Sequence, residues 1–405
     1  MTSNWETVRL GDVADVIGGG TPKSSVEEYW GGDVNWLTPK DLAKNPARYT
    51  GSGERRITQE GLKKSGAKML PKGSVLLTSR APVGYVSVAS GPIATNQGFK
   101  SLILNDGQLP EFWYYLLGHS TEYLRANSGG STFQEISGSS LKELKFSLPP
   151  LAEQRRIVDL IGSLDDAIEA ADIQIRNAFA LYSELLTAAA TIEAPLMPLG
   201  SILLEIKSRE SVSPDVKYRI AGLERSGLGF IDRGEVKGSD ISYRKLAAIQ
   251  EAQLVYRKLT AWEGPISVAG SEIAGSYVSP EFPVFNIDSG IYLPGLLRHI
   301  CRWPGFWDMM AGRLTGSVLR RKRLNPSQLL EIELPVPRMG QQRELIALLD
   351  AVWDRRCVAK DHAASLRKLR SELLTSLLSG AHTIPEAYDA IMASSEEIDD
   401  ERSVA

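Results

Sequence analysis

Cysteine and histidine are scarce in this sequence of 405 residues, which contains two cysteines and four histidines. Cys301 and Cys357 stand far apart, so neither a disulfide framework nor a cysteine-based zinc site is available. The histidines do not have the spacing of metal ligands, and we interpret them as structural or solvated residues. We therefore expect this chain to bind no metal and no other cofactor.

Long apolar runs are also missing. No stretch reaches the roughly 18 uncharged apolar residues that a membrane-spanning helix requires. The N-terminal region includes Glu6, Asp12 and Asp15 and lacks the apolar core of a signal peptide. With 43% hydrophobic and 23% charged residues, the composition is typical of a globular protein, which we expect to be soluble and cytoplasmic.

Two motifs that often carry chemistry are incomplete. An adenine methyltransferase requires Asn or Asp before a Pro-Pro pair and an aromatic residue after it, because these residues grip the flipped base. Here Pro149-Pro150 is flanked by Leu148 and Leu151. Gly18-Gly19-Gly20 lacks the strand, GxGxxG and helix context of a nucleotide site, and predicts a flexible loop.

A third pattern is closer to an active site. Asp215, Glu235 and Lys237 are spaced as in a metal-dependent nuclease, in which two carboxylates hold Mg²⁺ and a lysine aids the attacking water. Such a Glu-Val-Lys triplet should lie on a buried apolar strand, whereas Gly234 and Gly238 flank it here. The pattern leaves a catalytic role open but favours a non-catalytic one.

Charge is distributed unevenly along the chain. The net charge is −3, but residues 381–405 contain seven acidic residues and one basic residue, so the rest of the chain carries +3. We interpret residues 381–405 as a solvated, disordered tail. The mildly basic remainder is compatible with binding to DNA.

What the sequence does contain is a long internal repeat. Between residues 148 and 190, apolar or small residues recur in steps of four and three, which predicts a coiled-coil helix of about 57 Å. After an offset of 188 residues, Gln154-Arg155 returns as Gln342-Arg343, and Ser-Glu-Leu-Leu-Thr at 183–187 returns at 371–375. The predicted stripe of the first helix consists of Ile157, Ile161, Leu164, Ile168, Ala171, Ile175, Ala178, Tyr182, Leu185 and Ala189. A stripe of this length needs a partner helix, and the repeat supplies one.

Each predicted helix follows a globular block with a mixture of strands, helices and loops. The first block has candidate strands at 33–37, 74–80, 83–89 and 101–104, and a candidate helix at 110–124 with Phe112, Tyr115 and Leu116 facing inward. The second block repeats this order loosely, with strands at 254–256 and 282–287 and a helix at 294–310. The two helices are alike while the two blocks have diverged, which suggests one molecule that reads two different things.

This organisation resembles the specificity subunit of type I restriction–modification systems. The resemblance is carried by LPPLAEQRRI and VPRMGQQREL at the ends of the blocks, and by GGGTPKSSVEEYWGGDVNWLTPKDL and NQGFKSL in the first block. It covers about residues 5 to 380. The second block lacks counterparts of GGGTPK and NQGFK, so its target cannot be inferred from the first.

The resemblance implies a mixed α/β (α+β) fold with an internal pseudo-twofold repeat. Two similar target-recognition domains, 1–147 and 193–337, would be joined by two long antiparallel coiled-coil helices, 148–192 and 338–380, ahead of the tail at 381–405. Each domain would read half of an asymmetric bipartite site in double-stranded DNA. The helices would set the gap and dock two methyltransferase subunits and the restriction subunits. The partner subunits would use S-adenosylmethionine, ATP and Mg²⁺, and this chain would be non-catalytic.

Candidate contacts follow from side-chain chemistry, because Arg reads guanine, Asn or Gln reads adenine, and Lys binds phosphate. In the first block the DNA candidates are Lys23, Lys40, Arg80, Asn96, Gln97 and Lys100. In the second block they are Arg219, Arg225, Arg244, Arg257, Lys258, Arg320, Arg321, Lys322 and Arg323. The candidates for the coiled coil and for subunit docking are Gln154, Arg155, Ile157, Ile161, Leu164, Ile168, Gln342, Arg343, Leu345, Leu349 and Leu373.

Two questions stay open at this stage. Arg356 and Arg370 occupy stripe positions, so they either pair with acidic residues such as Asp165 or Glu184 on the other helix, or rotate outward so that Leu369 takes the stripe. The alternatives to a DNA-specificity subunit are a stand-alone DNA-cleaving or DNA-modifying enzyme and a protein-interaction scaffold.

Overall fold

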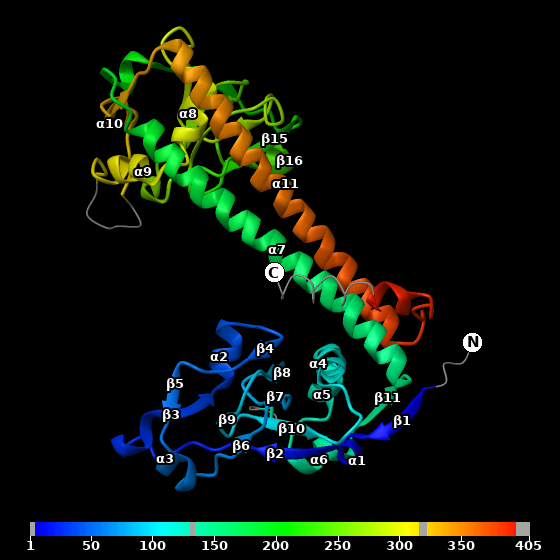
Figure 1. Ribbon diagram of the computed structural model, residues 1–405. Coiled ribbons are helices and arrows are strands. Elements are labelled where there is room, and N and C mark those ends of the chain that lie inside the picture. Colours follow the sequence, from blue (N-terminus) through cyan, green and yellow to red (C-terminus); the bar gives the residue numbers. More distant parts are fainter. Residues whose placement is uncertain (1–4, 130–133, 316–321, 394–405) are drawn as a thin grey trace. The chain divides into compact units, whose positions relative to one another are not determined.

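The computed structural model describes residues 5–129, 134–315 and 322–393 (Figure 1). The chain divides into two compact units. Unit 1 consists of residues 1–169 and 364–405, and unit 2 consists of residues 170–363. Each unit contains one globular block and one part of each long helix. No helix in the described ranges is both long and apolar enough to cross a membrane.

Unit 1 contains three sheets. The largest has the order β2-β10-β7-β8-β4, from strands β2 (Ala14–Gly18), β10 (Lys100–Leu104), β7 (Val75–Ser79), β8 (Val83–Ala89) and β4 (Tyr49–Thr50). The second has the order β5-β3-β9-β6, from β5 (Arg55–Ile57), β3 (Trp30–Leu37), β9 (Ile93–Thr95) and β6 (Met69–Leu70). A two-stranded sheet joins β1 (Glu6–Arg9) to β11 (Lys145–Leu148).

Unit 2 repeats this topology. The order β13-β21-β18-β19 matches β2-β10-β7-β8, with β13 (Leu203–Glu205), β21 (Val284–Ile287), β18 (Leu254–Tyr256) and β19 (Ile266–Val268). The sheet β14-β17-β20-β15-β16 comprises β14 (Glu210–Ser211), β17 (Lys245–Ala248), β20 (Tyr277–Val278), β15 (Lys217–Leu223) and β16 (Phe230–Lys237). Its parallel pair β15·β20 corresponds to the parallel pair β3·β9. The third sheet pairs β12 (Leu196–Pro198) with β22 (Glu333–Pro335). The mixed α/β fold and the duplication of the blocks are thus confirmed.

Short helices complete the blocks. In unit 1 they are α1 (Leu10–Val13), α2 (Pro39–Lys44), α3 (Gln59–Lys63), α4 (Pro110–His119), α5 (Thr121–Ala126), α6 (Gly138–Glu143) and the 3₁₀ helix η1 (Glu27–Tyr29). In unit 2 they are α8 (Pro294–Ile300), α9 (Pro304–Ala311), α10 (Pro326–Leu330) and the 3₁₀ helices η2 (Leu199–Ser201), η3 (Gly238–Asp240) and η4 (Ala261–Glu263).

The two predicted block helices are each interrupted. The helix expected at 294–310 breaks between α8 and α9, because Pro304 disfavours a helical conformation of Trp303, which is extended (φ −82°, ψ 124°). The helix expected at 110–124 breaks at Ser120, which leaves helical geometry (φ −84°, ψ 16°). The residues predicted to face inward on α4 are all buried.

The long helices α7 (Leu151–Ala190) and α11 (Met339–Leu378) each span 40 residues, as the repeat predicted. They run antiparallel within each unit (Figure 1). In unit 1, Arg370 of α11 pairs with Asp165 of α7. In unit 2, the ring of Trp353 lies 4.8 Å from that of Tyr182, and Arg356 lies over Phe179, three residues earlier in α7.

These contacts answer the question about the stripe. Arg370 stays in the stripe and pairs with Asp165, whereas Leu369 is exposed, so the pairing alternative is confirmed there. Among the residues that the structure describes, Arg356 forms no such pair with an acid. Its guanidinium lies 4.9 Å from the ring centroid of Phe179 and 5.0 Å from that of Trp353, a cation–π arrangement.

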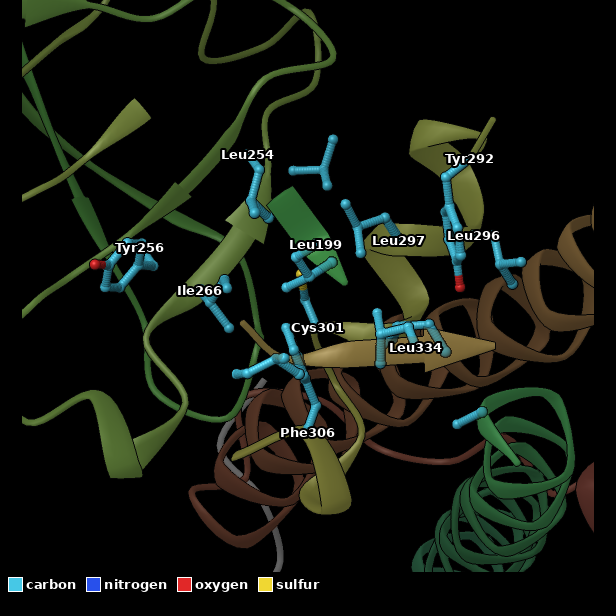
Figure 2. Packing of buried hydrophobic residues seen from close by; sticks show 14 of the residues in the cluster. Leu199, Leu254, Tyr256, Ile266, Tyr292, Leu296, Leu297, Cys301, Phe306 and Leu334 are labelled. Atoms are coloured by element: carbon cyan, nitrogen blue, oxygen red, sulfur yellow. The ribbon is translucent and has the colours of Figure 1, made fainter. Parts of the chain in front are cut away.

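The core of each block is continuous with its helices. In unit 2, the buried side chains of α8, α9 and the strands meet those of the long helices, with Leu199, Cys301 and Phe306 at the centre (Figure 2). In unit 1, Ile157 and Ile161 of α7 and Leu377 of α11 join the block's own core. Each block is therefore packed onto the helix pair by apolar burial, which is the main stabilising term in such structures.

The segment after α11 differs from the predicted disordered tail. Ile384 is buried in the core of unit 1, and the Tyr388 hydroxyl donates a hydrogen bond of 2.7 Å to Asp159 Oδ2. Arg156 Nε lies 2.6 Å from Asp389 Oδ1. The prediction is wrong for residues 381–393, because their few apolar and aromatic residues pack on α7 despite the acidic composition. The acidic residues after 393 lie outside the described residues.

Candidate nucleic-acid interface

Three segments of unit 1 that carry predicted DNA contacts meet at one sheet edge. Strands β3 and β9 are parallel, with Leu37 opposite Thr95, so the loops that follow both strands leave the sheet at the same edge. Thr38 and the first turn of α2, with Lys40, follow β3, whereas Asn96–Gly98 follow β9, and the Asn96 amide donates to the Leu37 carbonyl at 2.9 Å. The third segment is the loop 18–23, which lies against the end of β9.

The glycines of loop 18–23 are explained by close approach. The Gly20 amide donates to the Thr95 carbonyl at 2.9 Å, and the Trp36 indole donates to the Gly20 carbonyl at 3.0 Å. A Cβ on Gly19 would lie 2.0 Å from the Asn96 carbonyl oxygen, and none could fit without moving the backbone. The prediction of a flexible loop is therefore wrong for Gly19 and Gly20, which are fixed against the sheet.

We call the exposed side chains of these loops the unit 1 edge. Lys23, Lys40 and Gln97 are exposed there, as is Thr21, which the sequence analysis did not select. The Thr21 hydroxyl donates to Gln97 Oε1. Asn96 is half-buried, and its Oδ1 accepts from the Gly98 amide at 2.8 Å, so its carbonyl oxygen already serves the turn. The edge thus offers two ammonium groups and an amide.

Two further basic residues at this edge were missed. Arg55 lies opposite Trp36 at the start of β5, with its guanidinium 3.5 Å from the centroid of the Trp30 ring. Lys68 immediately precedes β6 and is exposed. Both strands are only two or three residues long, so no local alternation in the sequence indicated them.

Arg80 and Lys100 are less available than predicted. Both pair with Glu135, at 3.4 Å from Arg80 Nη1 and 3.5 Å from Lys100 Nζ. Glu135 also forms a β-bridge with Arg80, so the three side chains are held together. One carboxylate shared by two cations leaves a net positive charge close to the unit 1 edge.

Unit 2 collects a different set of charges at the equivalent place. Arg225, just after β15, and Arg257, just after β18, both pair with Glu263, at 3.1 and 3.3 Å. Arg323 pairs with Glu281 at 3.3 Å. We call these five residues the unit 2 edge. Its three cations and two carboxylates are paired with one another, whereas Lys23, Lys40 and Lys68 of unit 1 form no ion pair within the described ranges.

The remaining candidates of unit 2 are distributed around this edge. Arg244 is exposed just before β17, whose start lies at the same sheet edge as the end of β20. Lys258 and Lys322 are half-buried. Arg219 lies in the middle of β15 and pairs with Asp232 at 2.8 Å, so the structure does not bring it to the edge. Arg320 and Arg321 lie outside the described residues.

The nuclease-like triplet does not form a centre. Asp215 is almost fully exposed, and Lys237 Nζ lies 4.0 Å from its Oδ1. Glu235 instead faces Lys217 at 3.4 Å. The strand β16 that carries the triplet is exposed along most of its length. Within the described ranges, no group of three or more His, Cys, Asp or Glu side chains is arranged to hold a metal ion.

The predicted docking residues divide into buried and exposed ones. Gln154 and Gln342 are buried, and each Nε2 donates to a proline carbonyl five residues earlier, Pro149 at 2.9 Å and Pro337 at 2.8 Å. These glutamines fix the start of each long helix, and their amide groups are already used within the chain. The buried stripe residues are Ile157, Ile161 and Leu349, and the half-buried ones are Leu164, Ile168, Leu345 and Leu373. Arg155 and Arg343 are exposed.

Each block is also tied to the helices by a polar network. In unit 1, Tyr115 donates to Asp165 Oδ2 at 2.7 Å, and Arg48 donates to the Tyr115 hydroxyl at 3.1 Å. Arg370 completes this network through Asp165.

The network of unit 2 is built around a buried histidine. His299 Nδ1 lies 2.9 Å from the Tyr182 hydroxyl, and its Nε2 lies 2.9 Å from Asp350 Oδ1. Burial, reinforced by the nearby charge of Arg302, lowers the pKa of His299 to about 4, against an ordinary value of 6.5. This imidazole is therefore neutral near pH 7.

Comparison with known proteins agrees with this architecture. Residues 2–177 match the family model described as type I restriction modification DNA specificity domain. The chain is 46% identical over 171 residues to the type I restriction enzyme MjaIX specificity subunit of Methanocaldococcus jannaschii, and 30% identical over 169 residues to the EcoR124I/EcoR124II specificity subunit of Escherichia coli. The matches cover 42% and 40% of this chain and, in both cases, 40% of the relative, so the matched part spans less than half of each relative.

Solved structures extend the likeness in fold to nearly the whole chain. The S subunit of a type I restriction–modification system from M. genitalium is similar with a TM-score of 0.62 and 16% identity, over 93% of this chain and 96% of that one. A chain from a study of complex assembly and conformational transition of the type I R-M system gives a TM-score of 0.57 and 17% identity, over 92% and 97%. Residues 2–177 are thus similar to the type I DNA specificity domain family, in line with the resemblance noted from the sequence, and the likeness in fold extends over more than nine tenths of the chain.

Proposed function

We propose that this chain is the DNA-binding specificity subunit of a type I restriction–modification complex. Each unit reads one half of an asymmetric bipartite site in double-stranded DNA. The helices α7 and α11 set the gap between the half-sites and dock two methyltransferase subunits and the restriction subunits. The chain itself is non-catalytic, and its partners supply S-adenosylmethionine, ATP and Mg²⁺ chemistry.

The observation that carries this proposal is the repetition of fold beyond the matched family domain. The family model matches residues 2–177, yet unit 2 has the same central strand order and the same parallel pair as unit 1. A second block with this topology supports a second reading domain. The likeness in fold to the M. genitalium S subunit, over 93% of this chain, supports the same assignment.

The chemistry of the unit 1 edge supports contact with a duplex. Lys23, Lys40 and Lys68 are exposed and suited to phosphate oxygens, which fix position without reading sequence. Gln97 presents an amide of the kind that reads adenine in the major groove. The presence of this amide and of exposed lysines at the same sheet edge supports a role in binding DNA.

The unit 2 edge supports a different target. Its three arginines are paired with Glu263 and Glu281, so DNA phosphates would compete with carboxylates for the same guanidinium groups. Arginine is the side chain that reads guanine with two hydrogen bonds. Two edges with different donors favour two different half-sites.

A direct test compares the chain alone with the chain in complex. The purified chain, given duplex DNA, Mg²⁺ and S-adenosylmethionine, is expected to leave the DNA unmodified. Addition of the adenine methyltransferase chain from the same organism is expected to produce methylation at a split motif. Methyl transfer or cleavage by the chain alone would instead favour the stand-alone enzyme.

A further inference from the structure

Unit 2 contains an aromatic cavity that the proposed function does not use. The cavity has a volume of about 530 Å³ and lies where α7, α11 and the start of α9 meet the loop between β15 and β16. Its lining includes three indole rings, from Trp303, Trp307 and Trp353, and two arginines, Arg302 and Arg356. A cavity of this size accommodates a small organic molecule, and a largely aromatic lining with a few polar groups is typical of ligand sites.

The indole rings of the α9 region are held in place by close packing. A Cβ on Gly305 would lie 2.4 Å from the ring of Trp303. A Cβ on Gly264 would lie 2.6 Å from the ring of Trp307, whose indole also donates to the Cys301 carbonyl at 2.8 Å. Both rings therefore rest on backbone where a larger residue would displace them, so this wall of the cavity is preformed.

The two arginines carry positive charge that the chain does not neutralise. The guanidinium of Arg302 lies 4.0 Å from the centroid of the Trp353 ring, and that of Arg356 lies 5.0 Å from the same centroid. Among the described residues, neither arginine forms an ion pair with a carboxylate, and the Nε of each is buried without a hydrogen-bond partner. The described residues that line the cavity include no acid. Because buried donors are normally paired, a negatively charged ligand suits this site.

The corresponding cavity of unit 1 has a different chemistry. Its volume is about 370 Å³, and Leu374 of α11 lines it as the equivalent Leu186 of α7 lines the cavity of unit 2. Its arginine, Arg370, is already paired with Asp165. The described residues of its lining include no tryptophan. The combination of indole rings with unpaired guanidinium groups is therefore specific to the cavity of unit 2.

Two apolar side chains in the lining of the unit 2 cavity remain largely uncovered. Phe179 is 49% exposed and Leu228 is 54% exposed. An exposed apolar side chain gains free energy when a ligand removes it from water. Apolar groups beside two cations thus suit a ligand that has both an apolar ring and a negative charge.

We infer that this cavity binds a small, flat aromatic anion. The ring of the ligand packs against the indoles, and its anionic group supplies the counter-charge to Arg302 and Arg356. Guanidinium groups bind carboxylates and phosphates alike, so the ligand class is an aromatic ring joined to either anion. The bound ligand contacts α7, α9 and α11 together and stabilises the folded state of unit 2 by mass action. The inference goes beyond the proposed function and does not depend on it.

The experiment titrates the full chain with naphthoate in a calorimeter, and in parallel with adenosine monophosphate. Naphthoate is expected to bind saturably with one equivalent. Naphthamide, which has nearly the same shape but no charge, is expected to bind at least about tenfold more weakly, because it loses the hydrogen bonds to a charged group. The nucleotide arm distinguishes a phosphate from a carboxylate as the preferred anion.

Two pairs of variants test the site itself. Arg356→Met removes one cation and is expected to weaken naphthoate binding by at least about tenfold. Arg355→Met is its matched control, because Arg355 is the exposed neighbour on α11 and does not line the cavity. Leu228→Glu adds a carboxylate to the lining and is expected to weaken binding similarly, whereas Leu228→Gln adds the same shape without charge. Since Leu228 is exposed, both of its variants should fold.

The outcomes are distinct. Saturable binding of either anion that Arg356→Met and Leu228→Glu weaken, and that both controls preserve, supports the site. The inference is overturned if neither anion binds at millimolar concentration, if naphthamide binds as tightly as naphthoate, or if the variants bind like the wild type. Should Arg356→Met fail to fold, the two Leu228 variants decide the question. A negative result leaves the proposed function standing, because methylation with the partner chain is measured separately.

Discussion

Unit 1 and unit 2 share their strand order but carry opposite charges at one equivalent place. After β7 of unit 1, Arg80 forms a β-bridge with Glu135, whereas after β18 of unit 2, Leu259 forms the corresponding bridge with Arg323. The position of the acidic Glu135 in unit 1 is thus occupied by the basic Arg323 in unit 2. The buried strands therefore fix the topology, while the loops at the sheet edge are free to change chemistry.

The polar networks that hold each block to the helices differ in the same way. Unit 1 uses charge, with Arg370 and Asp165 across the helix pair and Arg48 on Tyr115. Unit 2 uses a buried neutral His299 between Tyr182 and Asp350. The stability of each unit is therefore expected to respond differently to substitution and to pH, and these responses distinguish the two units.

The largest expected effect concerns the glycine loop, which only unit 1 possesses. Gly19→Ala places a Cβ within 2.0 Å of a backbone oxygen, so the loop or β9 must shift. We expect a loss of about 3 kcal/mol in the free energy of unfolding, the upper part of the range for overpacking. Gly18→Ala is the matched control, since a Cβ there meets nothing within 4 Å, and urea denaturation compares the two. Equal stability of both variants would contradict the close approach.

The second effect is a pH dependence confined to unit 2. Because the pKa of His299 is lowered to about 4 in the folded state, the unfolded state binds more protons between about pH 6.5 and 4. The free energy of unfolding therefore falls as the pH decreases through this window, by about 2 kcal/mol from pH 7 to pH 5. His299→Gln is expected to remove this part of the slope in denaturation curves measured at both pH values. An unchanged slope would mean that His299 is not held neutral.

The smallest effect concerns the charged network of unit 1. Asp165→Asn keeps the shape of the side chain but removes its negative charge. The Asp165 carboxylate pairs with Arg370 and accepts a hydrogen bond from the Tyr115 hydroxyl. We expect a loss of about 1 kcal/mol, because the group is partly exposed and the full cost of breaking a buried pair does not apply. Asp166→Asn serves as control, since the Asp166 carboxylate is mostly exposed and makes a long contact of 3.5 Å with Arg48. Thermal unfolding that ranks the two variants the other way would contradict the network.

The repeat and the long helices could be predicted because their signals are local or in register. The stripe from Ile157 to Ala189 follows a fixed period, and the offset of 188 residues places both helix starts correctly. Strand β8 was predicted with its observed ends for the same reason, since residues 83–89 alternate like those of a half-buried strand.

The geometry of the edges could not be predicted in the same way. Strand β3 pairs with β9 across almost sixty residues, and no local pattern in the sequence encodes that partner. The role of Gly19 therefore became visible only once the Asn96 carbonyl was in place. The pairing of Arg80 and Lys100 with one carboxylate is likewise a product of the tertiary fold, so their chemistry could be named from the sequence but not their availability.

We propose that the two units read DNA independently and read different half-sites. The most direct test replaces residues 1–147 with the first block of another type I specificity subunit and maps methylated motifs in cells that contain the methyltransferase partner. We predict that one half of the motif changes, while the other half and the gap stay the same. A motif in which both halves change, or in which neither changes, would contradict independent reading by the two units.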